Sequence, residues 1–491
     1  MTSATIKYRE LITLSKVNET YLRVDCGRGL SQELSEFFSF YVPGYKFVPS
    51  YKSRMWDGKI RLFNLNTQLI YLGLLPYIKS FCNERDYDLE YDDDLESLHQ
   101  LSVAETEQFS QTLGLPFAAR KYQIDAVAHC IRHNRSLVLS PTGSGKSLII
   151  YLLTRFYRSK TLIIVPTVSL VRQMYGDFKD YGYKHECKLI TGGVDKENIE
   201  EQVTVSTWQS IYKMPASWFE QYDVVIGDEA HQFKAKSLTD IMTKMTLCKY
   251  RFGFTGTLDG TATHKLVLEG LFGEVKSFVK TKDLIDSNTL AELKIKILVL
   301  KYLTETCKIH SKDKFPEEMD FIVRNPKRNN FIKNLALSLE GNSLILFQYV
   351  DKHGKVLHDL LKQSVSKDRT LFFVFGGTDA QTRESVRSIT EKENNAIIIA
   401  SYGTFSTGVN IRNLHNIIFA SPSKSRVRNL QSIGRGLRKS ESKEACTLYD
   451  ISDDLQHKGR VNYTLKHLYE RVKIYNEEKF DYKLYKIKLE T

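Results

Sequence analysis

The stretch Ser140-Pro-Thr-Gly-Ser-Gly-Lys-Ser147 decides how the rest of the chain is interpreted. The apolar run Ser136–Leu139 precedes it and the apolar run Leu148–Phe156 follows it, which predicts a strand, a loop and a helix. Small residues let backbone N–H groups approach phosphate oxygens closely, and the N-terminus of the following helix favours negative charge. The stretch is therefore predicted to be a phosphate-binding loop.

Two side chains of this loop are expected to act on a bound nucleotide. Lys146 would neutralise the β- and γ-phosphates, and the hydroxyl of Ser147 would coordinate Mg²⁺. The usual pattern begins with a glycine, whereas this chain has Ser140 at that position. The other loop residues predicted to surround the phosphates are Thr142, Gly143, Ser144 and Gly145.

A pair of acids follows in the run Val224-Val-Ile-Gly-Asp-Glu-Ala-His231. Asp228 lies at the carboxyl end of a predicted strand, where it can hold Mg²⁺, and Glu229 beside it can polarise the attacking water. Taken alone, His231 would be an ordinary surface histidine, but next to these acids we expect it to report the nucleotide state to a neighbouring motif. The predicted cofactors are therefore ATP and Mg²⁺.

Short apolar runs alternate with helix-like segments on both sides of this site, which indicates parallel α/β sheets. The pattern is irregular from residue 284 to 325 and then resumes. We predict an α/β protein with two tandem lobes, each a parallel sheet with flanking helices, after a small α+β N-terminal domain. The predicted strands are Ser136–Leu139, Thr161–Val165, Val203–Ser206, Val224–Ile226, Ser343–Phe347, Thr370–Phe375, Ala396–Ala400 and Asn416–Ala420.

These patterns divide the chain into four predicted segments. Residues 1–100 form an N-terminal accessory domain that binds nucleic acid, 101–285 the first lobe and 286–455 the second. Residues 456–491 form a basic helical tail, in which Leu465, Leu468 and Val472 have the spacing of an amphipathic helix packed on the second lobe.

Composition supports an intracellular protein with a polyanionic partner. The 491 residues carry a formal charge of +12, which favours nucleic acid. The seven cysteines lie far apart in the sequence and have no zinc-ligand or redox spacing, which favours free thiols in a reducing compartment. No apolar run approaches the roughly 20 residues needed to span a bilayer, so we expect a soluble, cytoplasmic protein without a membrane partner.

With the phosphate loop and the acid pair, the chain resembles superfamily-2 helicases and translocases, which have two RecA-like lobes with ATP between them. Further stretches resemble motifs of that superfamily. In Arg120-Lys-Tyr122-Gln123, which is similar to the Q-motif, Gln123 would bind adenine through its amide and Tyr122 would pack nearby. The stretch Thr255-Gly-Thr257 resembles the TGT variant of DNA-directed members. Gly408 with Asn410 resembles motif V.

The stretch Gln431-Ser-Ile-Gly-Arg435-Gly-Leu-Arg438 resembles motif VI. Its two arginines are three residues apart, so they are neighbours on one face of a helix. An arginine that reaches the γ-phosphate stabilises the charge of the transferring phosphoryl group and can contribute about 10³–10⁵ in rate. In isolation the stretch could equally be a solvated basic helix turn. Together with the acids upstream, it predicts that Arg435 and Arg438 are catalytic.

The resemblance also implies that both lobes grip one nucleic-acid strand through its phosphates. Backbone amides and hydroxyls suit this task because phosphate contacts position a strand without reading its sequence. Each such residue could instead belong to an ordinary turn at the end of a strand. The matching residues are Pro166, Thr167, Gly192, Gly193, Thr207 and Gln209 in the first lobe, and Gln348, Gly376, Gly377 and Thr404 in the second.

The N-terminal segment from Tyr45 to Phe63 alternates cations with aromatic residues, and its five cations face a single acid, Asp57. Aromatic rings can stack on exposed bases while Lys and Arg follow the backbone. Alternatively, the aromatic residues form the core of a small domain with a solvated basic face. The residues predicted to contact nucleic acid are Lys46, Lys52, Arg54, Trp56, Lys59 and Arg61.

The segment from Phe37 to Phe63, followed by the lobes, resembles the UvsW-type phage helicases. The resemblance implies a monomeric ATP-dependent helicase that remodels branched DNA (forks, Holliday junctions, D-loops and R-loops, the last containing RNA) in phage recombination, repair and replication. One alternative is an RNA-directed ATPase of the same superfamily. A second is a DNA-binding or annealing protein that uses ATP only as a switch, and a restriction-type translocase is a third.

Overall fold

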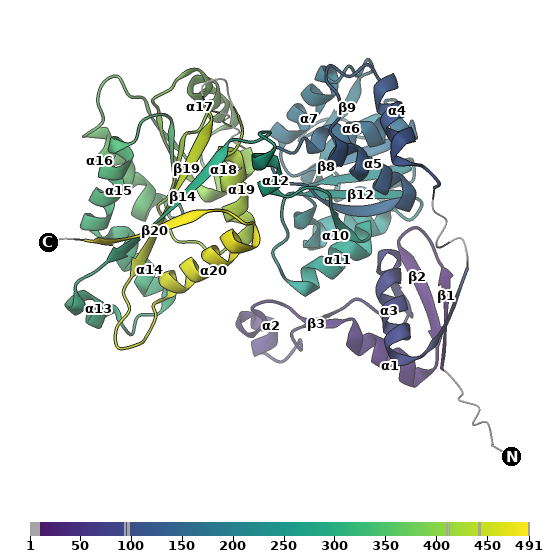
Figure 1. Cartoon of the computed structure of the whole chain (residues 1–491). Coiled ribbons are helices and arrows are strands. Elements are labelled where there is room, and N and C mark those ends of the chain that lie inside the picture. The colour runs from purple at the N-terminus through teal and green to yellow at the C-terminus, as the bar shows by residue number, and fades with distance from the viewer. Residues whose placement is uncertain are drawn as a thin grey trace. The chain divides into compact units, whose positions relative to one another are not determined.

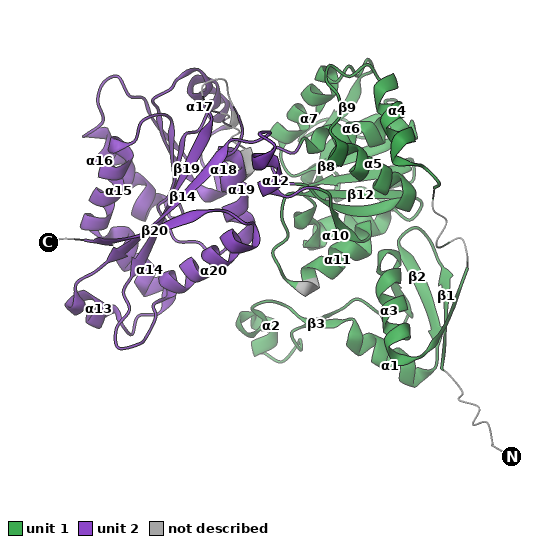
Figure 2. Ribbon diagram, viewed as in Figure 1, with its two compact units in different colours: residues 1–140, 145–278 green, residues 141–144, 279–491 purple. Residues whose placement is uncertain are grey.

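The computed structural model describes residues 10–92, 95, 99–408, 411, 413–439 and 443–489. The chain separates into two compact units (Figure 2). The first comprises residues 1–140 and 145–278, and the second comprises residues 141–144 and 279–491.

The first unit is built on a seven-stranded parallel sheet with the strand order β13-β7-β12-β11-β8-β10-β9. Figure 1 labels β8, β9 and β12 of this sheet. Successive residues of its strands enter different apolar clusters: Ile163 and Ile226 lie in one, Leu162 and Val225 in the other. Since successive strand residues point to opposite faces, both faces of the sheet are covered. The strands are β7 (Arg135–Leu139), β8 (Thr161–Val165), β9 (Cys187–Ile190), β10 (Val203–Thr207), β11 (Val224–Asp228), β12 (Tyr250–Thr255) and β13 (Val275–Ser277).

Helices from early and late in this unit cover the two faces. The cluster with Ile163 includes residues of α5, α6 and α7. The cluster with Val225 includes residues of α10 and α11. The helices are α4 (Val103–Thr112), α5 (Lys121–His133), α6 (Lys146–Tyr157), α7 (Val168–Asp180), α8 (Trp208–Ile211), α9 (Ala216–Phe219), η4 (Ala230–Lys234), α10 (Lys236–Lys244) and α11 (Ala262–Phe272).

The N-terminal part of this unit is a small mixed sheet of order β5-β2-β1-β6 with two helices, and a separate β3–β4 hairpin. Its β1–β2 pairing is antiparallel and its β1–β6 pairing is parallel. The elements are β1 (Leu11–Lys16), β2 (Tyr21–Cys26), α1 (Arg28–Phe37), β3 (Ser39–Tyr41), η1 (Tyr45–Phe47), α2 (Pro49–Lys52), β4 (Lys59–Arg61), β5 (Leu69–Tyr71), η2 (Leu72–Leu74), α3 (Leu75–Arg85) and β6 (Asp88–Tyr91).

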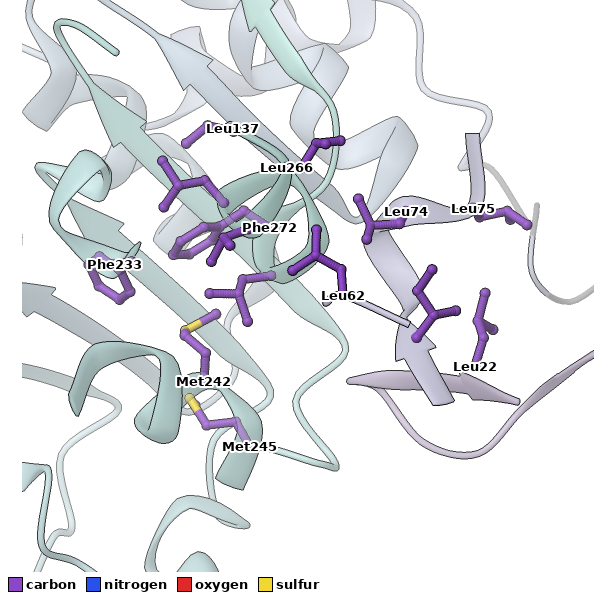
Figure 3. Packing of buried hydrophobic residues seen from close by; sticks show 14 of the residues in the cluster. Leu22, Leu62, Leu74, Leu75, Leu137, Phe233, Met242, Met245, Leu266 and Phe272 are labelled. Carbon is purple, nitrogen blue, oxygen red and sulfur yellow. The ribbon is translucent and has the colours of Figure 1, made fainter. Parts of the chain in front are cut away.

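The N-terminal part shares its apolar core with the larger sheet. Leu62 and Leu74 lie in the same buried cluster as Leu266 and Phe272 of α11 (Figure 3). At Gly73, an added Cβ would meet the backbone carbonyl of Glu269, so η2 and α11 approach as closely as backbones can. The predicted boundary at residue 100 therefore does not separate two compact bodies.

Polar contacts fix the same junction. The turn between β1 and β2 brings Glu19 to Arg135 at the start of β7, with an ion-pair distance of 2.9 Å. The buried guanidinium of Arg251 donates to the hydroxyl of Thr20 at 2.9 Å. On α3, the Tyr77 hydroxyl donates to the buried carboxylate of Glu269 at 2.6 Å.

The second unit is a second seven-stranded parallel sheet, of order β16-β17-β15-β18-β19-β14-β20. The predicted α/β fold with two parallel sheets and a small N-terminal α+β part is confirmed. The strands are β14 (Glu292–Lys301), β15 (Ser343–Phe347), β16 (Leu371–Val374), β17 (Ile397–Ser401), β18 (Asn416–Phe419), β19 (Ala445–Asp454) and β20 (Tyr482–Lys488). The helices are α12 (Thr281–Asp286), α13 (Thr304–His310), α14 (Phe315–Arg324), α15 (Pro326–Ser338), η5 (Val350–Gly354), α16 (Lys355–Lys362), α17 (Ala380–Lys392), α18 (Tyr402–Gly408), α19 (Arg426–Gly436) and α20 (Tyr463–Glu477).

Two parts of this unit differ from what the sequence indicated. The stretch from 284 to 325, where the sequence pattern is irregular and no elements were predicted, contains strand β14 and helices α13 and α14. The helix predicted around Leu465, Leu468 and Val472 is present as α20, but the helical tail predicted to residue 491 is wrong, because β20 follows and pairs with β14 at the sheet edge. Charged residues alternate with apolar ones in the first half of β14 and interrupt the apolar residues of β20, where the strands have solvated positions, and this weakened their apolar signal.

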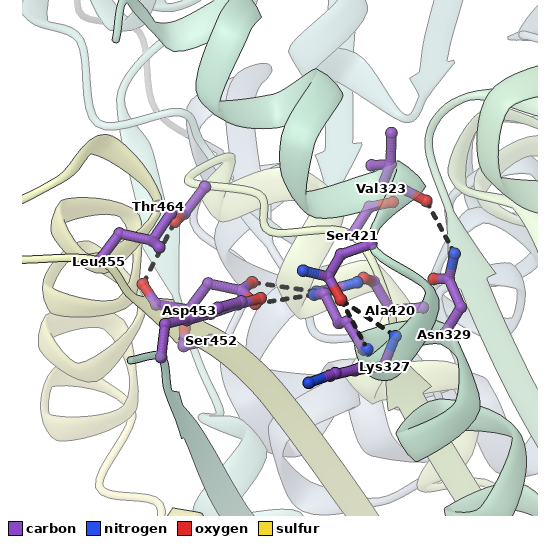
Figure 4. A network of polar contacts seen from close by, with 12 residues as sticks. Val323, Lys327, Asn329, Ala420, Ser421, Ser452, Asp453, Leu455 and Thr464 are labelled. Carbon is purple, nitrogen blue, oxygen red and sulfur yellow. Dashed lines mark hydrogen bonds and ion pairs between the residues drawn. The ribbon is translucent and has the colours of Figure 1, made fainter. Parts of the chain in front are cut away.

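Two buried arginines cross-link the second unit, and each is paired with a buried aspartate. Arg328 of α15 binds Asp453 of β19 through two bonds, of 2.8 and 3.1 Å, and donates to the carbonyl of Ala420 at 2.8 Å (Figure 4). Arg471 of α20 binds Asp450 at 2.8 Å, and both side chains are fully buried. A buried charge is tolerated only when it is paired and hydrogen-bonded, so these contacts fix α15 and α20 on the sheet.

All seven cysteines are free thiols, six buried and one half-buried, as predicted. The described helices include none that is both long enough and apolar enough to cross a membrane.

The Glu19–Arg135 pair yields a test of how the N-terminal part is attached. Burial would raise the pKa of Glu19, but Lys16 and Arg135 outweigh it and hold that pKa below its ordinary value. The pair therefore stabilises the fold above the pKa of an unfolded glutamate, and its contribution is lost as the pH falls below that value. We expect Glu19→Ala to cost on the order of 2–4 kcal/mol at neutral pH, measured by urea unfolding, because Arg135 is left nearly buried without its partner.

The double variant Glu19→Ala/Arg135→Met is the control, since it removes both charges. It should recover part of the lost free energy of unfolding, and the difference between Glu19→Ala and the parent protein should shrink in acid. Equal stability of the single variant and the parent at neutral pH would contradict this account.

Candidate functional site

The carboxyl ends of three neighbouring strands bring the predicted nucleotide residues together. Strand β12 lies between β7 and β11, so the loop after Leu139, the loop after Thr255 and the acid pair after Ile226 share one edge of the sheet. The amide of Ser140 donates to the carbonyl of Thr255 at 2.9 Å, which ties the start of the phosphate loop to β12.

Backbone conformation explains which glycines the loop needs. Gly143 and Gly145 have φ values of +83° and +79°, a region that side chains disfavour. Ser140 is not among the residues with positive φ, and its side chain is buried. A serine therefore fits where the usual pattern has its first glycine.

Protein groups contact the two loop side chains that were predicted to act on a nucleotide, Lys146 and Ser147. The Lys146 ammonium donates to the carbonyl of Ser140 at 3.2 Å. The hydroxyl of Ser147 lies 2.8 Å from that of Tyr181, a residue beyond α7 that the sequence did not single out. Burial raises the pKa of Tyr181, so its hydroxyl stays protonated and available as a hydrogen-bond donor.

The acid pair lies at the end of β11, which is on the other side of β12 from the phosphate loop. Asp228 is buried at the end of β11 and accepts a bond from the amide of Glu229 at 2.9 Å. Burial raises the pKa of Asp228 to about 6, the charge of Glu229 adds to that rise, and Lys146 opposes it. Glu229 has a left-handed backbone, with φ at +51°, which aims two successive carboxylates in different directions.

His231 connects the acid pair to β12. Its Nδ1 lies 2.9 Å from the hydroxyl of Thr255 and 3.4 Å from the carboxylate of Glu229. The Thr255 hydroxyl in turn donates to the carbonyl of Thr257 at 3.1 Å. His231 thus contacts both the predicted water-polarising acid and the Thr255–Thr257 motif.

The residues predicted to hold adenine lie at the start of α5. The side-chain amide of Gln123 accepts from the amide of Arg120 at 2.8 Å and donates to the carbonyl of Gly145 at 3.4 Å. The guanidinium of Arg120 donates to the Tyr122 hydroxyl at 3.3 Å. Gln123 therefore supports the phosphate loop, a role that the sequence had not suggested.

In the second unit, helix α19 carries Arg435 in its last turn, and Arg438 follows the helix. The Arg435 guanidinium lies over the ring of Phe405, 5.2 Å from its centroid. Arg426, at the first turn, pairs with Glu477 and, at 2.6 Å, with Glu478, both at the end of α20. The tail thus supports the helix that carries the motif VI arginine.

The buried ammonium of Lys443 holds the other end of α19. It donates to the carbonyls of Gly436 and, at 2.9 Å, of Arg438. Carbonyls at a helix C-terminus lack intrahelical partners and carry partial negative charge, so a cation stabilises them. The motif pattern gave no sign of Lys443. Gly408 ends α18, and Asn410 lies outside the described residues.

The predicted nucleic-acid residues of the first unit lie on the remaining part of the same sheet edge. They lie at or just after the carboxyl ends of β8, β9 and β10, which are neighbours in the order β8-β10-β9. The Thr167 hydroxyl caps α7 by accepting from Leu170, and Gln209 donates to the carbonyl of Pro166 at 3.3 Å. The edge therefore has one half with nucleotide motifs and one half with the residues Pro166, Thr167, Gly192, Gly193, Thr207 and Gln209.

The corresponding residues of the second unit follow β15, β16 and β17, which are also neighbours in their sheet. The backbone N–H of Gln348 donates to the Ser421 hydroxyl at 3.1 Å. The same hydroxyl lies 3.0 Å from Nδ1 of the buried His353. Thr404 lies in α18 with its hydroxyl 2.8 Å from that of Ser401. The sheet therefore brings Gln348, Gly376, Gly377 and Thr404 to one edge.

The N-terminal cations occupy the hairpin β3–β4 and the turns between its strands. Arg61 forms an ion pair with Asp57, and the Trp56 indole donates to the carbonyl of Lys59 at 2.9 Å. Trp56 and Arg61 therefore each contact another residue of the hairpin itself. Lys46, Lys52, Arg54 and Arg61 are exposed, whereas Lys59 is partly buried.

Comparisons with known proteins agree with this geometry. The family described as Type III restriction enzyme, res subunit, matches residues 116–260, and the family described as DNA helicase UvsW, N-terminal, matches residues 12–92. The ATP-dependent DNA helicase uvsW of Enterobacteria phage T4 is 36% identical over 491 residues, covering 94% of this chain and 97% of that protein. The chain belongs to the UvsW family of ATP-dependent DNA helicases.

Other similarities agree with this family. The crystal structure of T4 UvsW matches 98% of this chain and 100% of that chain, with a TM-score of 0.51 and 33% identity. The DNA 3′-5′ translocase XPB2 of Sulfurisphaera tokodaii is 25% identical over 380 residues, covering 70% of this chain and 83% of that protein. The predicted resemblance to UvsW-type helicases is confirmed.

In this UvsW-family helicase, Lys443 yields a test of how the motif VI arginines are positioned. Lys443→Met keeps the side-chain length but removes the cation that binds the α19 carbonyls. We expect kcat for ATP hydrolysis to fall about tenfold, which corresponds to one charge-assisted hydrogen bond, with little change in KM. Steady-state ATPase assays measure both constants.

Lys439→Met is the matched control, because Lys439 bonds to the side chain of Asn288 and not to α19. That variant should keep the parental kcat. A Lys443→Met enzyme that melts like the parent and hydrolyses ATP at the parental rate would show that the cap has no positioning role.

Proposed function

We propose that this UvsW-family helicase uses ATP and Mg²⁺ to remodel branched DNA: forks, Holliday junctions, D-loops and R-loops. The observation that supports the proposal is that the predicted nucleotide residues and the predicted nucleic-acid residues of the first lobe follow neighbouring strands of one sheet, and that the basic N-terminal hairpin belongs to the same compact unit as that sheet. Family membership supports the ATP-dependent helicase activity.

The nucleotide half has side chains that fit Mg²⁺ and ATP. Mg²⁺ prefers oxygen ligands and is usually held by one or two protein groups together with substrate phosphates. The buried carboxylate of Asp228 and the hydroxyl of Ser147 supply such oxygens, and bound Mg²⁺ would neutralise phosphate charge. Lys146 would bind the β- and γ-phosphates, and Glu229 would accept a proton from the attacking water.

We further propose that Arg435 and Arg438 of the second unit complete the site when ATP is bound. ATP would then favour the state in which both units contact it, and hydrolysis would release that state. Alternating grips by the predicted phosphate-binding residues of the two units would move the enzyme along a strand.

Glu229→Gln tests the chemical role of the acid pair. The amide cannot accept a proton, so we expect kcat for ATP hydrolysis to fall by about 10²–10⁴-fold while ATP still binds. ATP binding is measured with a fluorescent ATP analogue, and turnover is measured in the presence of forks, four-way junctions and R-loops. If Glu229→Gln hydrolysed ATP at the parental rate, the assignment of Glu229 would be wrong.

The same assays separate the alternatives. Hydrolysis stimulated by single-stranded RNA but not by DNA would identify an RNA-directed ATPase. Strand separation that persists in Lys146→Ala would identify a protein that uses nucleotide only as a switch.

The exposed hairpin cations provide a test of the N-terminal part by point substitution. Removing residues 1–100 would expose the shared apolar core and leave Arg135 and Arg251 without their partners Glu19 and Thr20, so a truncation would damage the ATPase unit itself. In Lys46→Ala/Lys52→Ala, we expect weaker fork binding and a slope of log Kd against log salt reduced by about two, because each lysine would neutralise one phosphate. DNA-independent ATPase should be unchanged.

Lys473→Ala, with a lysine on α20, is a control for the loss of positive charge alone. An unchanged salt slope in the hairpin variant would mean that Lys46 and Lys52 do not bind phosphates.

A further inference from the structure

Two apolar side chains of the N-terminal hairpin are held out in solvent. Residues 39–61, here called the hairpin tip segment, comprise β3, η1, α2 and β4. Phe47 is 81% exposed and Met55 is 80% exposed, the largest fractions for a large apolar side chain in the described part of the chain. Single exposed apolar residues are ordinary on protein surfaces, but two at this level in one short segment are not.

The segment around these side chains is rigidly packed. The Tyr45 ring stacks on Tyr41, with centroids 4.6 Å apart, and meets Tyr51 edge-on at 4.7 Å. Gly58, with φ at +83°, lies so close to the Tyr45 ring that a Cβ at this position would clash with the ring. Phe47 and Met55 are therefore presented by an ordered support, so binding through them would cost little conformational entropy.

Trp56, which the sequence predicted to contact nucleic acid, is partly covered by the segment itself. Its side chain is half-buried, and its indole N–H bonds to the carbonyl of Lys59 within the segment. The apolar groups that remain available to a ligand are those of Phe47 and Met55, on either side of α2 in the sequence.

The charges beside these side chains indicate what they bind. Lys46 directly precedes Phe47 and Arg54 directly precedes Met55, and both cations are exposed, as is Lys52 between them. The acid Asp57 is paired with Arg61. Cations beside exposed apolar groups match the two surfaces of nucleic acid, phosphates and base faces, whereas an apolar protein partner would have to cover three positive charges around the contact.

Base faces are hidden in a continuous duplex and exposed where strands diverge. Phe and Met are among the side chains that proteins insert between base steps, which unstacks them and bends the duplex. Unstacking costs least where base pairing is already interrupted. Apolar side chains beside phosphate-binding cations would therefore favour a branch point over linear duplex.

We propose that Phe47 and Met55 insert against the bases at a DNA branch point and open the step that the motor then separates. This inference rests on the proposed function and assigns the branch contact within it. The cations of the segment hold the flanking phosphates, and Trp56 holds the hairpin together.

The test uses the full-length protein without nucleotide and a fork with 2-aminopurine at the branch. Wild type should raise the 2-aminopurine fluorescence severalfold, as expected for an unstacked base. Phe47→Ala/Met55→Ala should abolish the rise and reduce the preference for fork over linear duplex by about tenfold or more, since removing one base-stacking side chain weakens binding about 5- to 150-fold. Fork unwinding should slow, while ATPase stimulated by linear single-stranded DNA stays within about twofold of wild type.

Two controls make the outcome specific. Ile309→Ala removes another highly exposed apolar side chain (72% exposed), from α13, and should behave as wild type. Lys46→Ala/Lys52→Ala should weaken all DNA binding but leave the fluorescence rise intact at saturating protein. Thermal unfolding should be unchanged in every variant, because none of these side chains is buried.

An equal fluorescence rise and equal fork preference in Phe47→Ala/Met55→Ala and wild type would overturn the inference, and the apolar pair would then serve a protein partner. A wild-type protein whose ATPase responds to no DNA would instead overturn the proposed function. The two failures are thus distinguishable.

Discussion

In a parallel sheet, every strand must be followed by a crossover, so all carboxyl ends meet at the same edge. That constraint brings the phosphate loop after β7, the acids after β11 and the Thr255–Thr257 motif after β12 into contact, although they are far apart in the sequence. It also places the predicted nucleic-acid residues on the next strands of the same edge. The strand that carries the acid pair, β11, is therefore the direct neighbour of β8, the first strand with predicted nucleic-acid residues.

The N-terminal part depends on that same sheet. Its η2 turn approaches the backbone of α11, and α11 is the helix that follows the Thr255–Thr257 motif. Shared apolar packing and the contacts of Glu19, Thr20 and Tyr77 join the N-terminal part to the large sheet of the first unit. A branch contact carried by the hairpin would therefore belong to the same compact unit as the acid pair and the Thr255–Thr257 motif.

In the second unit, paired buried charges attach helices to the sheet. Arg328 with Asp453, and Arg471 with Asp450, connect helices to the sheet where an unpaired charge would be very costly. The chain end contributes Arg471, Glu477, Glu478 and β20, so it completes the sheet and braces α19. The sequence had predicted only an amphipathic helix packed on the second lobe, because side-chain partners from distant strands leave no local pattern.

The sequence by itself determined the parts whose physical cause is local. Buried parallel strands are continuous apolar runs, so Thr161–Val165 and Ser343–Phe347 could be placed to the residue, and the phosphate loop requires glycines at fixed positions. Tertiary structure alone decided which groups support those motifs: Tyr181 on Ser147, Lys443 on α19 and Glu19 on Arg135. It also decided that Trp56 is a structural residue while Phe47 and Met55 are exposed, because exposure depends on what the rest of the chain covers.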